Sequence, residues 1–197
     1  MKDPYEISGQ FPPGLQVVAD NLDSADEKAR SIVAEISDAQ ASWRPREGAW
    51  SISQCLDHLG RTNVAYAEAL RAAICDATPA HHPLTNYRIQ PGWVSGIFIR
   101  LLEPPPKGKG RAPKKIQPAA NAKKDEALDC FLRSQVDVRA VLRQSLGFDL
   151  NRIRFRNPFV RSVRFTVGAG LLIIAAHDRR HLWQAEQVRR ADGFPKI

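Results

Sequence analysis

Apolar residues recur with the period of an α-helix in four parts of the chain. These segments span about residues 14–42, 51–77, 121–145 and 166–191. In the first segment, positions three and four residues apart form one apolar stripe: Val18, Leu22, Ala25, Ala29, Ile32, Val33, Ile36 and Ala39. Signals for strands are weak elsewhere, so the pattern predicts an all-α protein.

Residues that begin and end helices mark the boundaries of these segments. The stretch Ser51-Ile-Ser-Gln54 matches a capping box, with the serine as N-cap and the glutamine as third helical residue. Pro79 follows the second segment, Gly147 the third and Gly193 the fourth. Proline lacks the amide hydrogen that a helix needs, and glycine is favoured just after a helix ends. We therefore expect four separate helices.

The connections between the segments differ in length and character. Residues 43–50 form a tight link, whereas residues 79–120 form a long, proline-rich crossing with a short apolar piece, WVSGIFIRLL, at 93–102. We expect this piece to form at least one extra helical turn, and RIRFRNPF at 152–159 to form a short extended stretch. Four long helices with one long, Pro/Lys-rich crossover between the second and third predict a four-helix bundle. The whole chain, 1–197, is predicted to be one domain with an insertion at 79–120.

Composition supports a soluble protein with a single core. The chain has 197 residues and is 43% hydrophobic, with a net charge of +8 and a pI near 9.8. Basic residues cluster in KGKGRAPKK at 107–115 and among the arginines of 152–164, so nucleic-acid binding through phosphate contacts is one reading. We disfavour it, because no helix-turn-helix pattern and no interleaved aromatic residues accompany the charge.

Location follows from what the sequence lacks. The first residues show no apolar signal-peptide core, and the longest apolar run, 165–176, is shorter than the roughly twenty residues that span a bilayer. The three cysteines, Cys55, Cys75 and Cys130, are odd in number and lack CxxC spacing. Reduced thiols fit this pattern, so we expect a cytoplasmic protein without a membrane partner.

Two histidines lie in the middle of the apolar face of the fourth segment. His177 and His181 are four residues apart in AAHDRRHLWQ, so their rings lie one turn apart on the same side of a helix. Such a pair can bind one metal ion through imidazole nitrogens at about 2.0–2.1 Å. Two neutral histidines that make ordinary hydrogen bonds in the core are an equally good reading, and a third ligand would decide between them.

His58 is the best candidate for that third ligand. It lies at the flank of the apolar stripe of the second segment, beside small residues that leave room between helices. His81 and His82 are adjacent in a loop bounded by prolines, where we expect solvated side chains. Cys55 lies one turn before His58 but belongs to the apolar stripe, so we expect it in the core and not among the ligands.

The start of the second segment, Trp50-Ser-Ile, the histidine seven residues after Ser51, and the late AHDRRHLWQ together resemble the DinB-like helical-bundle metalloproteins. The resemblance covers most of the chain. It implies up-down-down-up connectivity and a divalent metal held by His58, His177 and His181, with zinc or nickel preferred. Characterised members include thiol-dependent transferases and a mycothiol-dependent maleylpyruvate isomerase. The basic stretch 107–115 departs from a compact member.

A metal with three protein ligands keeps an open position, as reactive sites do. It can lower the pKa of a bound water to about 7 or stabilise a thiolate. We therefore expect metal-dependent transfer or hydrolysis on a small molecule, with a low-molecular-weight thiol as nucleophile. A non-catalytic metal-binding bundle, or a homodimer that uses residues 93–102, is the alternative.

Four polar residues near the histidines have roles that the sequence leaves open. Gln54 and Gln184 lie on the faces of the predicted ligands, so we expect them in the pocket or as hydrogen-bond partners of the ligand imidazoles. Asp57 directly precedes His58, and Asp178 directly follows His177. Adjacent residues on a helix are rotated by about 100°, so both aspartates are turned away from the histidine faces. We expect these two carboxylates at the surface or as cap partners.

Overall fold

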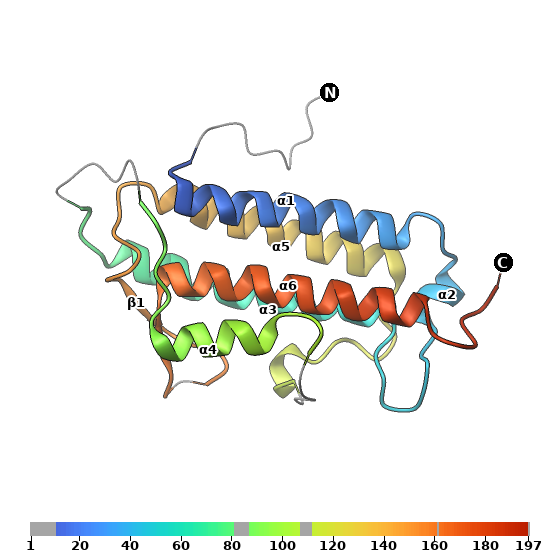
Figure 1. Ribbon diagram of the computed structural model, residues 1–197. Helices are drawn as coiled ribbons and strands as arrows, with labels where there is room; N and C mark the ends of the chain where they lie inside the picture. Colours follow the sequence, from blue (N-terminus) through green and yellow to red (C-terminus); the bar gives the residue numbers. More distant parts are fainter. Residues whose placement is uncertain (1–10, 81–86, 107–111, 161, 197) are drawn as a thin grey trace, which may run out of the picture.

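The computed structural model describes residues 11–80, 87–106, 112–160 and 162–196. Four long helices lie side by side in Figure 1, and each packs against two neighbours: α1 and α3 both contact α5 and α6. The elements are α1 (Pro13–Val33), α2 (Asp38–Ser42), α3 (Ile52–Cys75), α4 (Trp93–Leu102), η1 (Lys114–Ile116), α5 (Lys124–Gln144), β1 (Arg154–Arg156), β2 (Arg164–Thr166) and α6 (Val167–Arg189).

The colours of Figure 1 give the directions of the four helices. Helices α1 and α6 run one way along the bundle, and α3 and α5 run the other way. This is the up-down-down-up arrangement, in which the long crossover joins two parallel neighbours, α3 and α5. The predicted all-α bundle is confirmed, with one small addition: β1 and β2 pair as an antiparallel hairpin, Phe155 opposite Phe165. The expected extended stretch is the first strand of that hairpin.

The first predicted helix is in fact two helices. Helix α1 ends at Val33 and α2 begins after Ser37, because Ser37 and Gln40 form a second capping box that restarts the helix in a new direction. The capping box predicted for α3 is present, since Ser51 Oγ accepts a hydrogen bond from the amide of Gln54 at 3.2 Å and the Gln54 side chain accepts one from the amide of Ser51.

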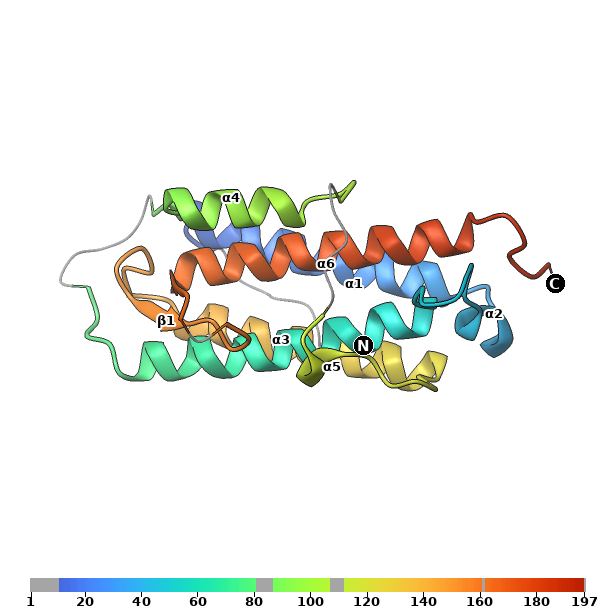
Figure 2. The same ribbon diagram turned by 90° about the horizontal axis from the view of Figure 1, so that it is seen from below.

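The crossover between α3 and α5 covers one side of the bundle. Helix α4 lies along α6 in both views (Figures 1 and 2) and packs against it. Its outer face stays apolar and exposed, with the Trp93 side chain 82% accessible to solvent. Further on, residues 112–120 run across α3. His81, His82 and residues 107–111 lie outside the described residues.

The core consists of two apolar clusters with a polar layer between them. One cluster joins the first half of α1 and α6 to the second half of α3 and α5, and the other joins the opposite halves. Between them, the four helices contribute buried polar side chains: Asp26, Asn63, Gln135, Arg139 and Asp178. The histidines of α3 and α6 lie at the same level of the bundle. No helix among the described residues is long and apolar enough to cross a membrane.

Candidate metal centre

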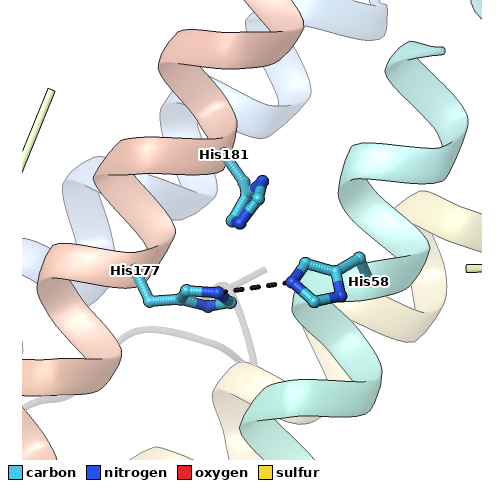
Figure 3. A group of neighbouring side chains, drawn as sticks. All are labelled: His58, His177 and His181. Atoms are coloured by element: carbon cyan, nitrogen blue, oxygen red, sulfur yellow. Dashed lines mark hydrogen bonds between the residues drawn. The ribbon is translucent and has the colours of Figure 1, made fainter. Parts of the chain in front are cut away.

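Three histidines from two helices converge on one point. His58 extends from α3, and His177 and His181 extend from α6 toward it (Figure 3). One nitrogen from each ring lies within 4.8 Å of the others, and His58 Nε2 is 3.3 Å from His177 Nε2. The ring centroids are 4.6–5.1 Å apart. Imidazoles that are remote in the sequence therefore share one centre, at the spacing that a single metal ion can bridge.

Burial keeps the three imidazoles neutral. His58 is 2% exposed, His181 is 8% exposed, and His177 is half-buried. Burial lowers the pKa of all three rings, because it disfavours the charged imidazolium, and the neighbouring rings lower the pKa of His177 and His181 further. A neutral imidazole has a nitrogen lone pair that can bind a metal, so the environment selects the ligand form.

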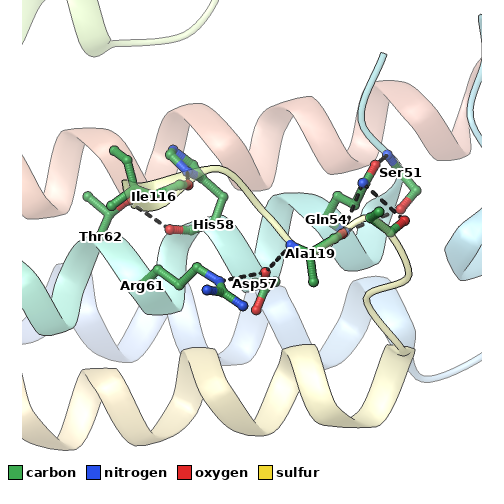
Figure 4. A network of polar contacts seen from close by, with 9 residues as sticks. Ser51, Gln54, Asp57, His58, Arg61, Thr62, Ile116 and Ala119 are labelled. Atoms are coloured by element: carbon green, nitrogen blue, oxygen red, sulfur yellow. Dashed lines mark hydrogen bonds and ion pairs between the residues drawn. The ribbon is translucent and has the colours of Figure 1, made fainter. Parts of the chain in front are cut away.

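Hydrogen bonds orient two of the rings. His58 Nδ1 lies 2.5 Å from the Ile116 carbonyl oxygen and donates to it, because that oxygen can only accept (Figure 4). His181 Nδ1 lies 2.9 Å from Gln184 Oε1 and donates in the same way. With the proton on Nδ1, each neutral ring has its lone pair on Nε2. His177 Nδ1 is buried and has no partner within the described residues.

The two glutamines differ in their surroundings. Gln184 contacts His181 directly, as a hydrogen-bond partner of that ring would. Gln54 is engaged elsewhere: its side chain completes the α3 capping box, and its Nε2 donates to the carbonyl of Ala119 at 3.1 Å. Gln54 therefore fixes the crossover segment on α3, and within the described residues it makes no hydrogen bond to the histidines.

Asp57 and Asp178 are buried, and the expectation of surface positions was wrong. Asp57 Oδ2 accepts from the Ala119 amide at 2.7 Å and from Arg61 at 2.8 Å, so it holds the crossover as well (Figure 4). Asp178 accepts from Asn63 at 3.0 Å and Gln135 at 2.9 Å, and its burial raises its pKa to about 7. Each long helix packs between two others, so a side chain turned away from the histidines still faces a neighbour.

The family follows from a comparison with family models. The model described as the DinB superfamily matches residues 21–185, a range that includes α3, most of α6 and all three histidines. The chain belongs to the DinB superfamily. The resemblance drawn from the Trp-Ser-Ile start, His58 and AHDRRHLWQ is thus confirmed. Comparisons with curated proteins and with solved structures give no match.

Trp50 contacts two histidines of this DinB site, and the sequence pattern did not predict that contact. Its ring centroid lies 4.7 Å from that of His58 and 5.5 Å from that of His181. Trp50 directly precedes Ser51, the N-cap of α3. From the sequence alone, packing in the core explains a tryptophan at this position equally well. Cys55 lies fully buried in an apolar cluster, as its stripe predicts, and burial raises the pKa of its thiol.

Proposed function

We propose that this DinB superfamily chain is a metal-dependent enzyme that transfers or hydrolyses a group on a small molecule. His58, His177 and His181 would hold a divalent transition metal, with zinc or nickel as the preferred ion, since imidazole nitrogens suit both. A low-molecular-weight thiol would be the nucleophile. The observation that carries the proposal is the approach of His58 Nε2 to His177 Nε2 at 3.3 Å.

That approach has a physical consequence for an empty cluster. The Nδ1 proton of His58 is committed to Ile116, so the Nε2 lone pair of His58 points at another imidazole nitrogen. His177 can relieve the repulsion between lone pairs only by placing its own proton on Nε2, which leaves a buried Nδ1 acceptor without a donor. A cation between the nitrogens removes the repulsion, because it binds both Nε2 lone pairs.

The chain's own residues have clear roles in such a site. When bound, the metal would supply a Lewis acid that lowers the pKa of a coordinated water or thiol. Ile116 and Gln184 orient two of the rings through hydrogen bonds. Trp50 packs against the rings of His58 and His181 and keeps water from that side of the cluster.

Elemental analysis of protein purified without a histidine tag tests the metal. We expect near-stoichiometric transition metal in the wild type and less than about a tenth of that in His181→Ala, because loss of one of three ligands removes most of the affinity. His81→Ala removes a histidine from the predicted loop and should retain the metal. Equal metal contents in all three proteins, including none, would refute the site.

Tryptophan fluorescence gives a second readout that does not depend on activity. Cu²⁺ quenches a nearby indole, whereas Zn²⁺, with its filled d shell, does not. We expect saturable quenching by Cu²⁺ that disappears in Trp50→Phe and persists in Trp93→Phe, since Trp93 is exposed on α4. Quenching that is unchanged in Trp50→Phe would place the ion elsewhere.

The chemistry is tested with the loaded protein. We expect the zinc- or nickel-loaded wild type to accelerate the reaction of glutathione or cysteine with an electrophile such as monochlorobimane, and His181→Ala to lose that acceleration. Loaded protein that binds metal but consumes no thiol with any electrophile would favour the non-catalytic bundle.

A further inference from the structure

A pocket of about 570 Å³ lies between the crossover and the hairpin, and none of the three histidines lines it. Volumes of this size are typical of sites for small organic molecules. Lys114 and Lys115 come from η1, Arg156 is the last residue of β1, and Asn157 directly follows that strand. Pro113 and Phe159 add apolar surface.

Both walls of this pocket are anchored on the helix that carries His58. On one side, Ile116 directly follows the two lysines and accepts the hydrogen bond from His58. On the other side, Asn157 Nδ2 donates to Tyr66 Oη at 2.9 Å. His58 and Tyr66 are eight residues apart on α3, which is about 12 Å of helix rise. Both walls of the pocket therefore connect to the stretch of α3 between His58 and Tyr66, although no residue of α3 is among the described residues that line it.

The charge of the pocket is of one sign. Three of its lining residues are cationic, and no acidic residue is among the described residues that line it. Within the described part of the chain, Lys114 and Lys115 make no ion pair. The charges of the two adjacent lysines repel each other, and a bound anion relieves that repulsion. The apolar surface of Phe159, which also packs edge-on against Tyr66, favours an anion with an organic body.

We propose that this pocket binds the anionic end of the substrate, a small organic carboxylate or phosphate. Lys114, Lys115 and Arg156 contact the anionic group, and the organic body lies on Phe159 and Pro113. The inference rests on the proposed function for the reaction, but the binding of an organic anion stands without it.

Isothermal titration calorimetry of the full-length protein tests the pocket with benzoate, phenyl phosphate and benzyl alcohol as probes. We expect saturable binding of at least one of the two anions, weakening with added salt, and no comparable binding of the neutral alcohol. Tighter binding of benzoate would identify a carboxylate site, and tighter binding of phenyl phosphate a phosphate site.

Charge-matched variants assign the binding to the pocket. Lys114→Gln/Lys115→Gln/Arg156→Gln should weaken binding of the anion at least about tenfold, since it removes all three positive charges among the described residues that line the pocket. The control removes three charges from exposed positions on and beside α5 and should bind as the wild type does: Lys123→Gln/Arg133→Gln/Arg143→Gln. Circular dichroism checks that both triple variants fold. If the pocket variant does not fold, Lys115→Gln alone replaces it and should show a smaller loss of affinity for the anion.

The outcomes separate this inference from the proposed function. Equal weakening in both triple variants, equal binding of benzyl alcohol, or no saturable anion binding would overturn the pocket, whatever the metal content. His181→Ala should still bind the anion. The pocket variant should in turn keep the metal content of the wild type. A protein that binds the anion but holds no metal would leave the pocket standing and refute the metal centre.

Discussion

Replacing Arg139 by methionine should destabilise the bundle, and more so at high pH than at low pH. The Arg139 side chain is 2% exposed, and its Nη2 lies 2.9 Å from Asp26 and 2.6 Å from Asp23. Arg139→Met keeps most of the length of the side chain and removes its charge. Asp26 is itself 6% exposed, so the variant leaves a buried carboxyl group without its ion-pair partner.

The magnitude follows from burial and from the pKa of Asp26. Removing one partner of a buried ion pair costs on the order of 3–5 kcal/mol. Burial raises the pKa of Asp26 from 3.8 to about 6 even with Arg139 beside it. A raised carboxyl pKa means that the folded state binds the extra proton, so stability falls as pH rises from about 4 to about 6. Without the cation this pKa rises further, and the fall continues above pH 6.

Urea unfolding followed by circular dichroism at pH 5 and pH 8 measures the effect. Each further pH unit over which Asp26 stays protonated in the folded variant lowers the free energy of unfolding by about 1.4 kcal/mol more. The difference between variant and wild type should therefore grow by up to about 3 kcal/mol between pH 6 and pH 8. The double variant Asp26→Leu/Arg139→Met should recover most of the stability, since it removes both charges. A loss that is the same at both pH values, or larger at pH 5, would refute the reasoning.

Two further predictions concern α3. Gly60→Ala should lower the unfolding free energy by roughly 1–2 kcal/mol in spite of alanine's better helix propensity, because its Cβ would lie 2.5 Å from Cys130 Sγ. The matched control is Gly96→Ala on α4, whose Cβ meets nothing within 4 Å. It should be neutral or stabilising by up to about 1 kcal/mol in the same urea assay. Equal effects at both glycines would contradict the close packing of Gly60 against Cys130. Ser51→Ala should cost about 1 kcal/mol through loss of the cap on Gln54, whereas an unchanged midpoint would show that the cap contributes little.

The helices and the histidine pair were predictable because their signals are local. A helical period needs only neighbouring residues, and a capping box such as Ser51 with Gln54 is four residues long. The placement of His177 and His181 on one face follows from helical geometry alone. Predicting His58 as the third ligand required the further expectation that α3 faces α6. That expectation came from small neighbours on its flank and from the family resemblance.

What the sequence did not predict depends on contacts between remote segments. The break between α1 and α2 has a local signal, Ser37 with Gln40, but the continuous apolar stripe conceals it. The burial of Asp178 is different, because its partners Asn63 and Gln135 come from α3 and α5. No pattern within α6 shows that side chains on other helices will donate hydrogen bonds to a buried carboxylate. The same holds for Trp50, whose contact with the histidines depends on the path of the chain into α3.

The polar layer across the middle of the bundle explains why Asp178 is buried and what its burial fixes. Two apolar clusters would pack in several registers, because apolar contacts are not directional. Hydrogen bonds and ion pairs between buried groups have a fixed geometry, and leaving them unmade is costly. Asp178 with Asn63 and Gln135 therefore fixes the register of α6 against α3 and α5. His177 directly precedes Asp178 on α6, so the contacts that hold Asp178 also set the distance between His177 and His58.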